Sequence, residues 1–228
     1  MKLIHDNEML DSFLSFIAAN ANDFTNANPY YMHLLYRGKD DTATKNHTAI
    51  LHRMFGTTAQ VGKELRKLDI LTEQGFYDGF EEGMCAYFSV NARDSIDAKT
   101  KVAHELINSL GTQDQRNLRS TVENSIQAAR PIGRYLILDY DIDNIDITQV
   151  QQWMTGISVK GFGIKTKGGY HLCIDTSVLK EKHTSEIDSL ILRADQKGKH
   201  ILSPMPGTMQ RGFPVTYFLF QEEVANVN

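Results

Sequence analysis

The stretch Arg134-Tyr-Leu-Ile-Leu-Asp-Tyr-Asp-Ile-Asp143 organises the rest of this chain. Its first part is an apolar run that ends in an acid at Asp139, and acids then alternate with apolar residues. In a β-strand, side chains two positions apart lie on the same face. The pattern therefore predicts a strand with Asp139 and Asp141 on one face, joined by Asp143 if the strand extends that far.

Carboxylates on one face of a strand repel each other, and this repulsion costs stability. A cation between the acids removes that cost, and ligation by oxygen alone suits Mg²⁺ or Mn²⁺. Two other interpretations remain open: the end of a solvated strand running into a polar turn, and a site for another ion. An EF-hand calcium loop starting at Asp139 is excluded, because its sixth and twelfth positions would be Asn144 and Val150 instead of Gly and Glu.

The composition is that of an ordinary globular protein, with 41% hydrophobic and 23% charged residues in a chain of 228. The net charge of −4 gives no global basic field, so phosphate contacts would need a local cluster of cations. Cys85 and Cys173 lie in apolar runs and are expected to be buried free thiols, not a disulfide or a zinc site. With no signal pattern and no membrane-length apolar run, we expect no membrane partner and a cytoplasmic location.

Hydrophobic periodicity and turn residues predict both helices and strands along the chain. Helices are expected at about 9–19, 47–55, 58–68, 95–110 (capped by Asp94 or Ser95), 113–129, around 150–153, and 185–194. Strands are expected at 30–36, 84–90, 135–139, 161–166, 170–175 and 215–220. Because a Gly-Gly turn joins two of these strands as a hairpin, the pattern favours an α+β (mixed α/β) fold over a doubly wound parallel sheet. We expect a single domain over 1–228, with an N-terminal lobe of about 1–130 and a metal-bearing lobe of about 131–228.

A second informative stretch is Ile164-Lys-Thr-Lys-Gly-Gly-Tyr-His-Leu-Cys-Ile-Asp175. Its glycines, including Gly169, allow a backbone to approach a ligand closely, and Lys165 and Lys167 supply charge for phosphates. His171 follows at the start of an apolar strand and is a candidate phosphate or metal partner. The alternative is a core or hairpin histidine with surface lysines around it.

The third stretch is Ser203-Pro-Met-Pro-Gly-Thr-Met-Gln-Arg-Gly-Phe-Pro-Val215. Its density of Gly and Pro predicts an irregular loop, and Thr208, Gln210 and Arg211 place hydrogen-bond donors on it. The alternative is a surface loop that only joins two strands.

Taken in order, these stretches resemble the catalytic core of the archaeo-eukaryotic primase and primase-polymerase superfamily, in its viral and plasmid forms. The family's acid-x-acid motif is matched by Leu138-Asp-Tyr-Asp141, and its small-x-His motif by Gly169-Tyr-His171. Its third motif, an acid on a strand, is best matched by Asp195, with Asp188 and Asp175 as alternatives. The resemblance covers roughly residues 84 to 220, including a Pro206-Gly-Thr208 loop with a following Gly212, and Ser89-Val-Asn-Ala-Arg93 at a strand end.

The resemblance implies an RRM-like sheet and hairpin packed with an N-terminal α/β lobe. It also implies a metal-dependent nucleotidyltransferase, a primase or DNA polymerase of phage or plasmid type that uses nucleoside triphosphates on a single-stranded DNA template. Asp139, Asp141 and Asp195 would hold Mg²⁺ or Mn²⁺, and His171 would contact the triphosphate. The nucleotide would also be bound by Lys165, Lys167, Gly169, Arg211 and Arg93.

Three questions stay open at this point. Arg93 lies at a strand-to-helix turn, where it would contact a template or nucleotide phosphate or else pair with Asp97. The location would be the host cytoplasm if the protein is viral, and the partners would include a helicase or another replication protein. Two other functions remain: a metal-dependent phosphodiesterase or nucleotide-modifying enzyme on the same fold, and a catalytically silent nucleic-acid-binding subunit.

Overall fold

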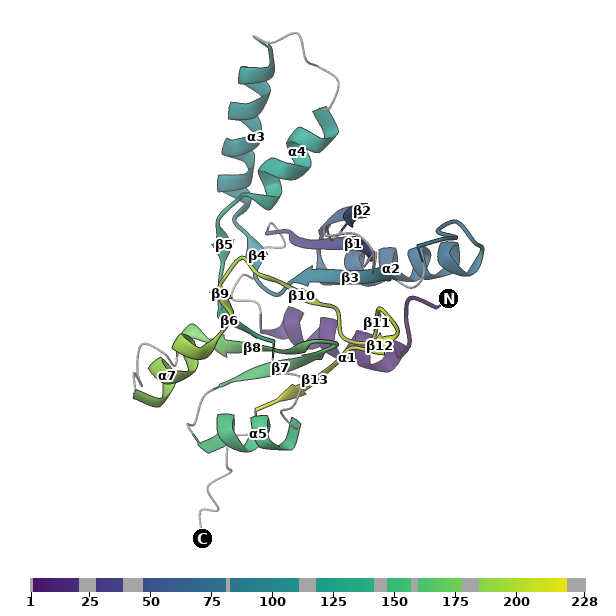
Figure 1. The fold of residues 1–228 in the computed structure, drawn as a ribbon. Coiled ribbons are helices and arrows are strands. Elements are labelled where there is room, and N and C mark those ends of the chain that lie inside the picture. The colour runs from purple at the N-terminus through teal and green to yellow at the C-terminus, as the bar shows by residue number, and fades with distance from the viewer. Residues whose placement is uncertain are drawn as a thin grey trace.

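The computed structural model describes residues 2–20, 28–38, 47–80, 83–110, 118–141, 147–156, 160–177 and 185–220. Helices and antiparallel sheets alternate along these segments, which confirms the mixed α+β class (Figure 1). Asp143 lies outside the described residues, so its predicted place on the acidic face stays a prediction.

The first large sheet is built mainly from the N-terminal part of the chain. This part consists of α1 (Asn7–Ala19), β1 (Tyr30–Gly38), β2 (His47–Gly56), α2 (Thr58–Glu73) and β3 (Met84–Ser89). A late strand, β10 (Leu202–Pro204), pairs with β3 and completes an antiparallel sheet in the order β10-β3-β1-β2. The helices begin at side-chain caps: Asp6 accepts a hydrogen bond from the backbone of Met9, and Thr57 forms a capping box with Gln60.

A helical hairpin projects away from both large sheets (Figure 1). It consists of β4 (Ala92–Arg93), α3 (Ser95–Leu110), α4 (Leu118–Gln127) and β5 (Pro131–Ile132). The strands β4 and β5 pair at its base. Asp94 caps α3 as predicted, since its Oδ1 accepts hydrogen bonds from the N–H groups of Ile96 at 2.9 Å and Asp97 at 3.1 Å.

The second large sheet carries the acidic stretch. Its part of the chain comprises β6 (Tyr135–Tyr140), α5 (Ile147–Gly156), β7 (Gly161–Thr166), β8 (Gly169–Asp175), α7 (Ser185–Arg193), β9 (Gln196–Gly198), β11 (Met209–Gln210), β12 (Phe213–Pro214) and β13 (Thr216–Leu219). The sheet is antiparallel throughout, in the order β13-β7-β8-β6-β9. From β6 to β9 the chain follows a β-α-β-β-α-β succession, the topology of ferredoxin-like sheets. The predicted β7–β8 hairpin is confirmed.

The two faces of this second sheet have different neighbours. On one face, Leu138 and Leu172 pack with Met154 of α5 and Ile191 of α7, and both helices lie on that side (Figure 1). The other face joins a larger core that also contains α1, α2 and the first sheet. Asp139 extends from this second face, at the end of β6 where the core stops.

One predicted element is wrong: residues 47–55 form the strand β2 instead of a helix. Nine backbone partners along β1, from Gly38↔His47 to Tyr30↔Gly56, hold this segment in the sheet. Local sequence did not reveal this, because the partner strand supplies the deciding hydrogen bonds. Cys85 and Cys173 are buried free thiols as predicted. No helix in the described part of the chain is both long and apolar enough to span a membrane.

Candidate functional site

Asp139 and His171 are direct cross-strand partners on β6 and β8. Their side chains lie on the same face of the sheet, with His171 Nε2 3.2 Å from Asp139 Oδ1. The acid-x-acid strand and the small-x-His hairpin thus lie on neighbouring strands of one sheet, with both side chains on one face. The cause is the pairing of the two strands, because antiparallel pairing places each side chain of β6 beside its partner on β8, and every second pair lies on the same face.

Ser203 on β10 fixes the other side of the imidazole. Its Oγ lies 3.0 Å from His171 Nδ1. Burial, together with the nearby charge of Arg37, lowers the pKa of His171 to about 4, so the ring is neutral at pH 7. Since the carboxylate of Asp139 can only accept, Nε2 carries the hydrogen and Nδ1 accepts from the Ser203 hydroxyl. Ser203 is 1% exposed, which excludes it as a nucleophile on an external substrate.

Three carboxylates gather at the end of β6. The backbone N–H of Asp195 donates to the carbonyl of Asp139 at 2.8 Å, and Asp195 Oδ2 accepts from the backbone N–H of Asp141, also at 2.8 Å. Burial, followed by the charges of Asp141 and Asp195, raises the pKa of Asp139 to about 6, with Arg37 acting in the opposite direction. The negative charges of Asp139, Asp141 and Asp195 thus lie close together, and Arg37 offsets only part of their effect on Asp139.

The structure also separates the candidates for the third acid. Asp195 directly precedes β9, which pairs with β6 beside Asp139. Asp175 lies at the far end of β8, where Arg134 Nε donates to its Oδ2 at 2.8 Å. Asp188 is an exposed residue of α7, on the sheet face opposite the acids. Asp195 is therefore the acid that joins Asp139 and Asp141, whereas Arg134 balances Asp175.

A cavity of about 680 Å³ opens in front of Asp139 and His171, between the two large sheets. Its lining comes from β1 and β3 of the first sheet, from β6 to β9 and the β7–β8 turn of the second, and from β10, the residues before it, and the β11–β12 hairpin. The lining residues are Leu35, Arg37, Tyr87, Asp139, Asp141, Thr166, Lys167, Gly168, His171, Gln196, His200, Ile201, Leu202, Gln210 and Arg211. Asp141 faces the β7–β8 turn, since a side chain at Gly168 would start 3.6 Å from its Oδ1.

Three cations line the cavity with the acids: Arg37, Lys167 and Arg211. Within the described residues, no carboxylate forms an ion pair with any of them. Lys167 Nζ donates instead to the carbonyl of Arg211 at 3.1 Å, which ties the β7–β8 turn to the β11–β12 turn. Arg211 has a φ of 53°, a left-handed conformation that is costly for a bulky residue and is typical of functional turns.

Lys165 does not belong to this group. It pairs with Tyr170 across β7 and β8, on the face opposite His171, and its Nζ lies 6.0 Å from the centre of the Tyr170 ring. The prediction that Lys165 and Lys167 converge on one cleft is therefore wrong for Lys165. Within a strand, residues two positions apart lie on the same face, so Lys167 would lie on the face of Lys165 if the strand continued. The strand β7 ends at Thr166, however, and Lys167 reaches the cavity from the turn.

Gly169 and Arg93 also have defined places. Gly169 opens β8 with a φ of 152°, a backbone conformation that few other residues adopt, directly before the Tyr170-His171 pair. Arg93 does not line the acid cavity. The alternative pairing of Arg93 with Asp97 is wrong, because Asp97 pairs with Lys101 and accepts a hydrogen bond from the backbone of Arg130.

Several cavity residues had no signal in the local sequence. Arg37 and Tyr87 come from β1 and β3 of the first sheet, and the Arg37 guanidinium lies 4.9 Å from the centre of the Tyr87 ring. Gln210 connects the two halves: its Nε2 donates to the Tyr87 hydroxyl at 3.2 Å, and its Oε1 accepts from the backbone of Lys167 at 2.7 Å. Only the packing of the two sheets brings these residues to the acids.

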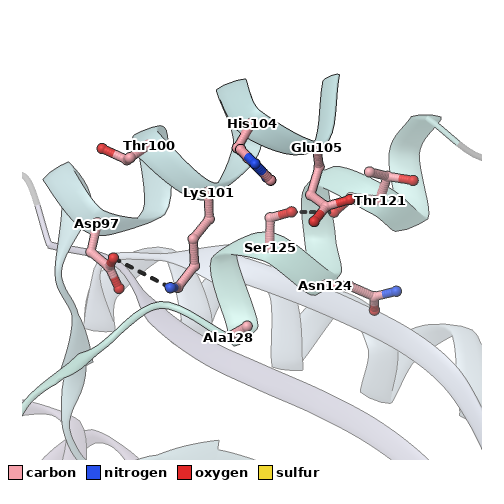
Figure 2. A pocket seen from close by; sticks show the side chains of 9 residues that line it. All are labelled: Asp97, Thr100, Lys101, His104, Glu105, Thr121, Asn124, Ser125 and Ala128. Atoms are coloured by element: carbon pink, nitrogen blue, oxygen red, sulfur yellow. Dashed lines mark hydrogen bonds and ion pairs between the residues drawn. The ribbon is translucent and has the colours of Figure 1, made fainter. Parts of the chain in front are cut away.

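A second hollow of similar size, about 690 Å³, lies between α3 and α4 (Figure 2). Its charges are partly satisfied internally, since Lys101 Nζ lies 3.4 Å from Asp97 Oδ1. Figure 2 also shows Ser125, whose hydroxyl donates to the backbone carbonyl of Thr121 at 2.8 Å. In the part of the chain that the structure describes, this hollow has neither three neighbouring carboxylates nor several cations without a carboxylate partner, so it is the weaker candidate for chemistry.

The acid cavity suits a hard divalent cation by its chemistry. Its acidic ligands are all oxygen donors, and burial followed by the charges of Asp141 and Asp195 raises the pKa of Asp139, so a nearby cation would stabilise its ionised form. Among the described residues, no group of three or more His, Cys, Asp or Glu side chains is already arranged to hold a metal ion. Mg²⁺ characteristically uses one or two carboxylates together with substrate phosphates, and it does not need a closed protein cage.

No protein-family model, no curated protein and no solved structure matches this chain.

Proposed function

We propose that this protein is a metal-dependent nucleotidyltransferase of the primase or DNA polymerase type. It would join nucleoside triphosphates on a single-stranded DNA template that a helicase or another replication protein exposes. One observation carries the proposal: a single cavity holds the carboxylates of Asp139 and Asp141 opposite Arg37, Lys167 and Arg211. A ligand that is both metal-bound and strongly anionic, such as a nucleoside triphosphate, satisfies both sets of charges.

In this proposal Asp139, Asp141 and Asp195 hold Mg²⁺ or Mn²⁺, which supplies Lewis-acid stabilisation of the phosphoryl oxygens when bound. Lys167 and Arg211 neutralise charge on the triphosphate from the β7–β8 and β11–β12 turns. Because two hydrogen bonds between side chains and backbone join the turns, these cations are held in position before the nucleotide arrives.

His171 has two tasks in this arrangement. Its Nε2–H donates to Asp139 and orients that carboxylate toward the cavity. The ring also lines the cavity, where a bound triphosphate would compete with Asp139 for the same hydrogen. A neutral ring suits this role, since it donates one hydrogen without cancelling the charge of the acids.

A gel assay tests the proposal directly. The protein is incubated with labelled nucleotides, Mg²⁺ or Mn²⁺, and a single-stranded template with and without a primer. Extended strands support nucleotidyl transfer, and the double variant Asp139→Asn, Asp141→Asn should make none while retaining its circular dichroism spectrum. Hydrolysed nucleotide without extension would point to a phosphodiesterase or nucleotide-modifying enzyme. Template binding with neither product would point to a silent binding subunit.

A further inference from the structure

Arg93 is a buried cation whose charge the described residues leave without a carboxylate partner. Its side chain is 3% exposed, at the base of the α3–α4 hairpin. A guanidinium carries five N–H donors. Two contacts are present, from Nη1 to the carbonyl of Ala129 and from Nη2 to the carbonyl of His200, and each is long at 3.4 Å. Arg93 Nε has no hydrogen-bond partner among the described residues.

This arrangement is unusual for a purely structural arginine. Buried charges are normally paired, because an uncompensated charge is expensive to desolvate. Ala129 lies just past the C-terminal end of α4, where the helix dipole supplies a partial negative charge. That partial charge does not neutralise a whole guanidinium. Arg130, the neighbouring cation, cannot help, because it is a second positive charge and is already paired with Asp94.

Arg93 lines an open hollow of about 450 Å³ whose other walls supply neutral hydrogen-bonding groups. The hollow is lined by Arg93, Asn124, Gln127, Ala128, Ala129, Pro131 and His200. None of these residues is acidic. His200 also lines the acid cavity, so the two hollows adjoin at this residue. At Asn124 and Ala128, the Arg93 hollow also adjoins the hollow between α3 and α4, because these two residues line both (Figure 2).

We propose that the Arg93 hollow is a second phosphate-binding site, which holds a backbone phosphate of the single-stranded nucleic acid as it leaves the acid cavity past His200. The inference rests on the proposed function, which makes a nucleic acid strand the ligand. The phosphate would supply the counter-charge that Arg93 lacks, and Asn124 and Gln127 would donate hydrogen bonds to its oxygens. The α3–α4 hairpin is then the platform along which the strand runs.

The test is the binding of a fluorescently labelled single-stranded oligonucleotide in EDTA, followed by anisotropy over a range of salt concentrations. Without metal or nucleotide, this readout does not depend on nucleotidyl transfer. Replacing Arg93 by Gln should weaken binding roughly tenfold and reduce the slope of log affinity against log salt by about 0.7, the value for one phosphate contact on a single strand. Arg66→Gln is the matched control, since Arg66 pairs with Asp11 and lines neither hollow.

A second pair of variants covers the case in which Arg93→Gln does not fold. Gln127→Glu keeps the shape of the side chain and places a carboxylate in the hollow, so it should raise the melting temperature and weaken oligonucleotide binding. Gln127→Lys should strengthen binding and steepen the salt slope. Wild-type affinity and slope in both Gln127 variants would overturn the proposal. A second result would also overturn it: inorganic phosphate binds at Arg93, but these variants leave the affinity for the oligonucleotide unchanged. The site would then hold a free anion and not the nucleic acid.

Discussion

His171 Nε2 lies 3.2 Å from Asp139 Oδ1, across a directly paired position of β6 and β8. This contact joins the acid-x-acid and small-x-His motifs. Ser203 on β10 lies against the other ring nitrogen, His171 Nδ1. The hydrogen bond orients both side chains, and Asp139 is the carboxyl group whose pKa is raised, to about 6. Perturbed carboxyl groups in clefts of this kind are typical of functional sites.

The first prediction concerns the carboxylates and metal. Wild-type protein should melt at a higher temperature with Mn²⁺ and a nucleoside triphosphate than in EDTA, by mass action. The double variant Asp139→Asn, Asp141→Asn should show no such gain and should be as stable as wild type in EDTA, or slightly more stable, because the mutual repulsion is gone. Asp195→Asn should reduce the gain, whereas Asp188→Asn, on the opposite face, should keep it. Equal melting of all four proteins, unmoved by Mn²⁺, would leave the acids without a metal role.

The second prediction concerns pH. Because the pKa of Asp139 rises from 3.8 to about 6 on folding, the folded protein binds this proton more tightly than the unfolded chain. The contribution of Asp139 to stability in EDTA should therefore fall by up to about 3 kcal/mol as pH rises from about 4 to about 6, whereas His171, whose pKa is lowered to about 4, contributes with the opposite sign over this range. Asp139→Asn removes that contribution, so the difference in unfolding free energy between variant and wild type should grow over this range in urea titrations. A constant difference at all pH values would contradict the raised pKa.

The third prediction separates two neighbouring lysines. Replacing Lys167 by Gln should weaken binding of a nucleoside triphosphate with Mn²⁺ roughly tenfold, the loss of one charge-assisted contact. Replacing Lys165 by Gln should leave that affinity unchanged, because Lys165 lies over Tyr170 on the other face. The two variants remove the same charge from positions two residues apart, so isothermal titration calorimetry on both tests the orientation of the hairpin. Equal losses would mean that only net charge matters.

The fourth prediction concerns the tautomer of His171. Replacing Ser203 by Ala leaves the buried Nδ1 without its donor and should cost about 1–3 kcal/mol of stability. The freed ring can also adopt the other tautomer, which withdraws the hydrogen from Asp139, and ¹⁵N chemical shifts of the imidazole would report the change. Ser12→Ala is the control, because its hydroxyl contacts Tyr217 at an exposed position. A variant with unchanged imidazole shifts would show that Ser203 does not set the tautomer.

Local sequence was sufficient for the elements whose evidence is contained in neighbouring residues. The alternation after Leu138 placed Asp139 and Asp141 at a strand end, and the Gly-Gly turn placed His171 on a hairpin. The preference for Asp195 as the third acid came from the family resemblance instead, and its place beside Asp139 depends on the pairing of β9 with β6. Side-chain periodicity and turn chemistry are short-range properties, so one strand or one hairpin carries them completely.

Tertiary structure decided everything that depends on a partner strand or on sheet packing. Residues 47–56 are a strand because β1 offers a full ladder of hydrogen bonds. Arg37 and Tyr87 enter the cavity because the two sheets meet there, and Lys165 is excluded by the face on which it lies. The buried position of Arg93 depends equally on α4 and on the chain before β10. A contact between distant segments is formed by the energy of the whole fold, and no short stretch of the sequence specifies it.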